Sequence, residues 1–202
     1  TAMEHTSELT KALSELKRIT GVSLQVYADT EEQQEQALTQ IRCLCTAYRE
    51  KYNKTDFLQN LMLNGIPSYD IHERASRLHI SAEEKRVLFL LEARSADDTV
   101  REILKNLFPS QTKTYLVPIR EDSIAILRPL RSGEIPGQMR QIASTIVDTL
   151  NTEALAHVQV SYSSVIDTLA ELSGAFREAS LALKVGKLFY SEQTVFPYNE
   201  LG

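Results

Sequence analysis

The run from Arg86 to Leu91 limits most strongly how this chain can fold. It reads Arg-Val-Leu-Phe-Leu-Leu, one basic residue followed by five apolar ones. A strand with a single buried face alternates apolar and polar residues, whereas a strand covered on both faces carries a nearly unbroken apolar run. The pattern therefore predicts a strand that is buried on both faces of a sheet.

The elements that follow this strand narrow the fold class. Helical spacing, apolar alternation and turn residues predict a helix at Asp97–Phe108, strands at Thr114–Ile119 and Ser123–Leu127, a helix over residues 139–150, a strand at His157–Tyr162, a helix at Gly174–Tyr190 and a strand at Val195–Phe196. Thr168 and Glu171 form a capping-box pattern ahead of the last long helix. The order β-α-β-β-α-β-α-β is that of the ferredoxin-like split plan with an added helix and edge strand. We expect an α+β fold with an antiparallel sheet.

The part before Arg86 is mostly helical by its pattern. It predicts a helix at Glu4–Ile19 that Gly21 ends, a strand at Val22–Tyr27, a helix that Thr30 caps, a break at 53–55, and short helices at Asp56–Leu63 and Ser68–Leu78. We expect an N-terminal helix-strand-helix region at residues 1–66, which senses or dimerises. A connecting segment at 67–81 and a sheet domain at 82–202 follow it.

An aromatic stripe runs along the predicted N-terminal helices. Tyr48 and Tyr52 follow Ile41 and Leu44 at spacings of three or four, and Phe57 comes shortly after. Such a stripe indicates a core or a dimer seam more often than a cofactor site. Tyr48, Tyr52 and Phe57 are therefore candidate interface residues, and we expect a homodimer.

Composition and motifs exclude several classes of function. The formal net charge is −5, and the basic residues are interspersed with acidic ones, so the chain is not expected to grip DNA by itself. No apolar run approaches the roughly 20 residues of a membrane span. Cys43 and Cys45 fit a reduced cytoplasmic protein. No phosphate loop, metal-ligand spacing or nucleophile motif is present in the sequence, and we expect no cofactor, no metal and no catalytic residue.

The predicted hairpin carries the first resemblance to a known family. Ile119-Arg120-Glu121-Asp122, followed by Ser-Ile-Ala-Ile-Leu, is laid out like the hairpin of GGDEF nucleotide cyclases, in which two glycines and two acids precede an apolar strand. Ile119 and Arg120 occupy the glycine positions, and their side chains would obstruct a nucleotide. Glu92 is the single carboxylate near the end of the first strand, which supports two-metal chemistry poorly. The resemblance implies a degenerate, non-catalytic hairpin at Arg120, Glu121 and Asp122.

The end of the chain carries the second resemblance. Leu169-Ala-Glu-Leu, Ala175-Phe-Arg-Glu-Ala and Tyr198-Asn-Glu-Leu-Gly202 resemble the PucR/CdaR family of bacterial transcription regulators, with Phe176 in place of the usual tyrosine and Glu200 in place of an aspartate. In that family a DNA-binding helix-turn-helix follows directly. The resemblance implies a truncated regulatory portion of a cytoplasmic regulator, possessing a GGDEF-like domain and contacting DNA only through the missing helix-turn-helix.

Three functions remain open at this point. The favoured one is the effector-sensing and dimerising portion of a regulator, of sugar-diacid or related carbon metabolism. The second is a divergent nucleotide-binding or cyclase-like domain, with Glu92, Glu121 and Asp122 beside a metal. The third is a small-ligand or partner-binding module centred on Tyr48, Tyr52 and Phe57.

Overall fold

The computed structural model describes residues 2–63, 65–94 and 97–201, apart from the side chains of residues 2–5 and 50–52. The chain divides into two compact units, an N-terminal unit at Thr1–Lys54 and a C-terminal unit at Thr55–Gly202. The boundary between the units falls inside the long helix α2 (Glu31–Leu63). The predicted break at 53–55 is wrong, because α2 continues through these residues.

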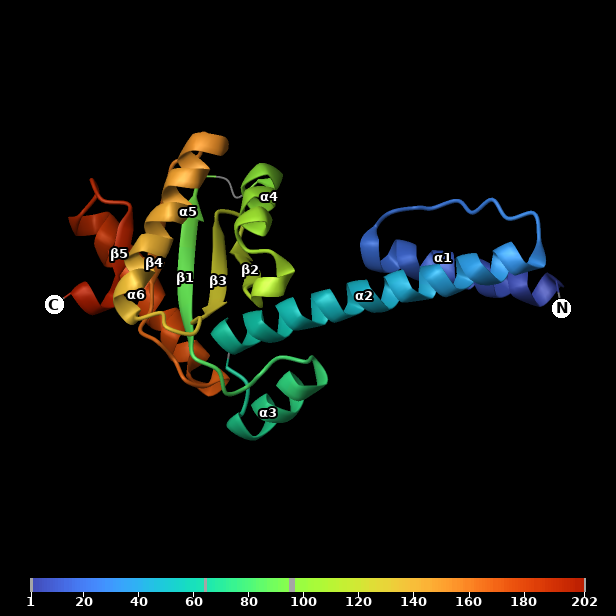
Figure 1. Cartoon of the computed structure of the whole chain (residues 1–202), viewed down its shortest axis with the longest axis horizontal. Helices are drawn as coiled ribbons and strands as arrows, with labels where there is room; N and C mark the ends of the chain where they lie inside the picture. Colours follow the sequence, from blue (N-terminus) through green and yellow to red (C-terminus); the bar gives the residue numbers. More distant parts are fainter. Residues whose placement is uncertain (1, 64, 95–96, 202) are drawn as a thin grey trace. The chain divides into compact units, whose positions relative to one another are not determined.

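The N-terminal unit pairs α1 (Ala2–Thr20) with the first part of α2. Arg42 lies 3.5 Å from Glu8, and further along both helices Arg49 pairs with Glu15, so the two helices run parallel. Parallel neighbours need a connection that returns along their length, and Figure 1 shows the segment after α1 doing so. Gly21 ends α1 at a φ of 74°, and the Thr30 hydroxyl accepts the Gln33 backbone N–H at 3.2 Å to cap α2, both as predicted.

The predicted strand at Val22–Tyr27 is wrong. Residues 22–29 belong to no helix or strand, and Val22 and Tyr27 are 55% and 90% exposed. Val26 packs on the small core between the helices. The alternating pattern therefore marks an extended connector, because an alternating segment becomes a strand only beside another strand that can share its hydrogen bonds.

The C-terminal unit is built on a five-stranded sheet in the order β2-β3-β1-β4-β5, and its elements follow the predicted order (Figure 1). The strands are β1 (Arg86–Ala93), β2 (Tyr115–Arg120), β3 (Ser123–Pro129), β4 (Val158–Tyr162) and β5 (Val195–Pro197). The helices are the end of α2, α3 (Ser68–Arg77), α4 (Asp98–Leu107), α5 (Met139–Glu153) and α6 (Leu172–Phe189), with short 3-10 turns at Ser110–Thr112, Pro136–Gln138, Leu169–Glu171 and Tyr198–Glu200. All neighbouring strands are antiparallel except β4 and β5. The expected α+β fold with a mostly antiparallel sheet is confirmed.

The central strand β1 contributes to two separate cores, which confirms the prediction from its apolar run. Leu88 and Leu90 are buried with residues of α6, α3 and the end of α2 on one face of the sheet. Val87, Phe89 and Leu91 are buried with residues of α4 and α5 on the other face. Side chains alternate between the faces of a strand, so one short run supplies the centre of both cores.

Residues between the end of the N-terminal unit and β1 join the first of these cores. Phe57, Leu58 and Leu61 of α2, with Ile71 and Ala75 of α3, are buried there, and the Arg74 guanidinium lies 5.5 Å from the centre of the Phe57 ring. Residues 55–63 and 66–80 therefore pack with the sheet, whereas the sequence predicts an N-terminal region that ends at 66. Phe57 is 2% exposed, so its expected place in an interface is corrected to a place in the core.

Two polar features fix loops against the sheet. The Glu171 carboxylate accepts the backbone N–H groups of Asp167 and Thr168 at 2.8 and 2.9 Å, which lowers the pKa of Glu171 and confirms half of the predicted capping box. Arg128 of β3, 6% exposed, makes two 2.7 Å hydrogen bonds to Glu134 in the loop before α5. The loop is therefore held to β3 by a nearly buried ion pair.

Candidate functional site

The tip of the β2–β3 hairpin lies beside the end of β1. Glu121 and Asp122 form the two-residue turn, and the backbone N–H of Ala93 donates to the Asp122 carbonyl at 2.9 Å. Glu92 of β1 stands opposite Ser123 of β3 in the ladder. Three chain segments thus converge, and their side chains form one wall of a hollow.

The hollow, here called the hairpin-tip cleft, has a volume of about 580 Å³. Its other wall is the face of α6 that carries Phe176, Ser180, Leu183, Lys184 and Lys187, residues spaced one helical turn apart. The remaining lining residues are Leu63, Leu90, Glu92, Ile119, Arg120, Ser123 and Leu188. Half of all these lining residues are apolar, and typical small-molecule sites likewise combine apolar walls with a few placed polar groups.

The charged groups of the cleft are mainly cationic. Arg120, Lys184 and Lys187 contribute three positive charges against the single carboxylate of Glu92. The Lys187 ammonium donates to Glu92 Oε1, so that carboxylate is already engaged. A partly apolar hollow with surplus cations suits an anionic ligand, because charge-assisted hydrogen bonds are strongest where water is partly excluded.

Comparison with known proteins places this architecture in a family. Residues 64–185 match the family described as GGDEF-like domain, which is more than half of the chain. The chain belongs to the GGDEF-like domain family. A search of curated proteins found no match.

The β2–β3 hairpin of this GGDEF-like domain carries Ile119 and Arg120 at the two positions where the sequence comparison expects glycines. The side chains of Ile119 and Arg120, at the expected glycine positions, both line the cleft. The left-handed φ values found among the described residues fall elsewhere, at His79, Lys113, Leu155 and three glycines, so the hairpin adopts backbone angles that ordinary residues accept. The structure thus places Arg120 in the cleft, while Glu121 is exposed and Asp122 half-buried in the turn outside its lining.

Sequence reasoning missed the contribution of α6. The sequence pattern predicted a helix at Gly174–Tyr190 but no site residue on it, although Phe176, Ser180, Lys184 and Lys187 share one face. A mixed apolar and basic stripe on a helix that packs against the predicted hairpin would have been the available signal. Glu92, which accepts from Lys187, was predicted from the sequence as the single carboxylate near the end of the first strand.

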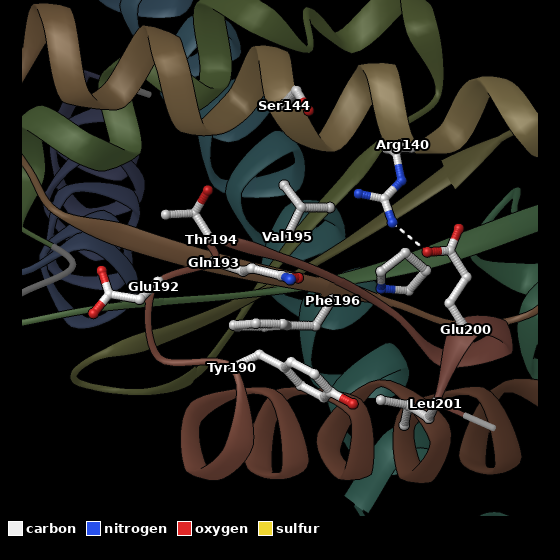
Figure 2. A pocket seen from close by; sticks show the side chains of 11 residues that line it. Arg140, Ser144, Tyr190, Glu192, Gln193, Thr194, Val195, Phe196, Glu200 and Leu201 are labelled. Atoms are coloured by element: carbon white, nitrogen blue, oxygen red, sulfur yellow. Dashed lines mark hydrogen bonds and ion pairs between the residues drawn. The ribbon is translucent and has the colours of Figure 1, made fainter.

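A second hollow, of about 510 Å³, lies between α5, β5 and the segments that flank β5 (Figure 2). Arg140 of α5 pairs with Glu200 across one end of it, and Glu192 lies on the loop before β5. Its lining therefore holds one cation and two carboxylates, and the cation is already paired. The hairpin-tip cleft has the stronger surplus of charge for holding a ligand.

The candidate interface residues on α2 are described only in part. Tyr48 is 39% exposed on α2, and the side chain of Tyr52 lies outside the described residues. Across the part of the chain that the structure describes, no three His, Cys, Asp or Glu side chains are grouped to hold a metal ion. None of the helices in the same part of the chain is long and apolar enough to cross a membrane.

Proposed function

We propose that this chain is the non-catalytic, effector-sensing portion of a cytoplasmic bacterial transcription regulator of the PucR/CdaR type. Membership of the GGDEF-like domain family supports the sheet domain in this role, and the resemblance of the chain's ending to those regulators supports the class of protein. In regulators of that type DNA is contacted by a helix-turn-helix, and the proposal assigns DNA contact to such a domain and not to the sheet domain. A coding sequence with no helix-turn-helix downstream of Gly202 would contradict this assignment.

The observation that carries the proposal is the charge of the hairpin-tip cleft. Cyclase chemistry on nucleoside triphosphates requires carboxylates to hold divalent cations. In this cleft the Lys187 ammonium engages the Glu92 carboxylate, and Arg120 and Lys184 add further positive charge. Such a cleft favours binding an anionic effector over holding a metal.

The anionic effector that we propose is a dicarboxylate of the sugar-diacid class. Carboxylates accept charge-assisted hydrogen bonds from lysine and arginine, and arginine can hold them in a bidentate manner. The apolar residues Leu90, Phe176 and Leu183 line the same cleft, and their presence reduces the water around those contacts when the effector is bound. Binding would stabilise the folded domain by mass action, so a shift in melting temperature reports it.

The test is thermal denaturation with increasing glucarate, a sugar diacid, and separately with GTP and Mg²⁺. We expect glucarate to raise the melting temperature of the wild type, and Lys184→Met to weaken binding by roughly ten- to a hundredfold through loss of one charge-assisted contact. Lys105→Met is the matched control, since Lys105 is an exposed lysine on α4, which packs on the opposite face of the sheet. It should bind glucarate as the wild type does.

Two results would overturn the proposal. One is a glucarate shift that is absent, or that Lys184→Met leaves unchanged. The other is stabilisation by GTP and Mg²⁺ that Glu121→Ala removes, which would favour a nucleotide-binding domain instead.

A further inference from the structure

Helix α2 has a wider apolar arc than α1 covers. Leu38, Ile41 and Cys45 are 7%, 5% and 6% exposed, and Ile41 and Cys45 pack with Leu16 of α1. At about 3.6 residues per turn, Leu44 and Tyr48 lie on the neighbouring strip of the helix surface, where they are 45% and 39% exposed. An amphipathic helix with two adjacent apolar strips is typical of a bundle in which it packs against two neighbours.

The second strip, here called the α2 stripe, consists of Ala37, Gln40, Leu44, Ala47 and Tyr48. It carries no charge, and Gln33 and Gln36 extend it towards the start of the helix. All the charged side chains between Glu31 and Arg49 lie outside the strip at helical spacing, and Arg42 and Arg49 among them pair with α1. The centres of protein interfaces are likewise depleted of charged residues.

We propose that the α2 stripe is the contact surface for a second copy of this chain, related to the first by a two-fold axis. A two-fold contact brings the same patch of both copies together, so a charged strip would place like charges opposite one another. The uncharged α2 stripe avoids this cost, while its charged flanks remain in water. The result is a four-helix arrangement of α1 and α2 from each copy.

The size of the N-terminal unit supports this partner. Among the side chains of this unit that the structure describes, the buried apolar ones are few, namely Leu16, Leu38, Ile41 and Cys45. Small units bury a low fraction of their surface and commonly gain stability by association. A second copy would cover Leu44 without requiring any other protein. The inference rests on the N-terminal unit and is independent of whether the hairpin-tip cleft binds a ligand.

The test is the molar mass of the full chain, measured by light scattering after size-exclusion chromatography over a dilution series. We expect the wild type to have the mass of a dimer and Leu44→Glu to have half that mass. Thr39→Glu is the control, because Thr39 is exposed on α2 away from the stripe, and it should remain dimeric. Circular dichroism checks that each variant keeps its helices.

A second variant keeps the proposal testable should Leu44→Glu unfold. Ala47 is exposed, so Ala47→Glu adds charge to the stripe without entering the core, and it should also halve the mass. A monomeric wild type would overturn the proposal and leave the stripe to a different protein. A dimer that survives both glutamate substitutions would place the contact elsewhere on the chain.

Discussion

Replacing Gly186 with alanine is expected to lower the free energy of unfolding by about 1–3 kcal/mol, the usual cost of forcing extra volume into a packed site. A Cβ at this position of α6 would lie 2.3 Å from ring carbons of Phe196 in β5, far inside contact distance. The Phe196 ring is 2% exposed and has little room to withdraw. Alanine favours helix over glycine by about 1 kcal/mol, but the steric overlap outweighs that gain. Urea denaturation followed by circular dichroism measures the difference.

Gly174→Ala is the matched control on the same helix. The nearest atom to a Cβ there is Arg177 Nη2 at 3.9 Å, the far end of a flexible side chain. Only the helix preference then acts, and we expect a gain of up to about 1 kcal/mol in unfolding free energy. If Gly186→Ala instead raises the free energy of unfolding as Gly174→Ala does, the close packing of α6 on β5 is wrong.

The second large effect is expected at the ion pair between Glu134 and Arg128. Glu134→Gln removes the negative charge opposite a guanidinium that is 6% exposed, and it turns one hydrogen-bond acceptor into a donor facing another donor. Leaving a buried charge without its partner costs about 2–3 kcal/mol when the partner is itself not fully buried. Glu121→Gln, at the exposed hairpin turn, should leave the unfolding free energy unchanged.

The same pair gives the stability a defined pH dependence. Hydrogen bonds from Arg128 lower the pKa of Glu134 from its ordinary 4.5 to about 2 in the folded chain. A carboxylate whose folded pKa is lowered stabilises the fold above its unfolded pKa, and this contribution declines as the pH falls from about 4.5 towards 2. The wild type should therefore lose its advantage over Glu134→Gln across that window. An advantage that persists unchanged at pH 2 would contradict the assignment.

Much of the C-terminal unit follows from local sequence patterns. The unbroken apolar run of β1 predicted burial on both faces, and the Glu171 cap predicted where the last helix begins. These signals are readable because they arise from residues that are neighbours in the chain and from the fixed period of each element.

Other features depend on contacts that one segment alone does not encode. Residues 22–27 alternate like a strand but have no strand beside them. Phe57 resembled an interface residue because its sequence neighbours form a stripe, yet α3 and the sheet bury it. The cations of the hairpin-tip cleft come from the ends of elements far apart in sequence, Arg120 and Lys187 among them, and only the folded sheet brings them together.

The outer strand β2 has a consequence for solubility. A sheet edge with free backbone groups can recruit strands from other molecules and seed aggregation. In β2, Pro118 offers no N–H, the ladder is irregular between Pro118 and Arg120, and the Gln59 side chain already donates to the Pro118 carbonyl at 3.0 Å. This edge is therefore closed to added strands near the hairpin, which protects the domain from edge-to-edge polymerisation at high concentration.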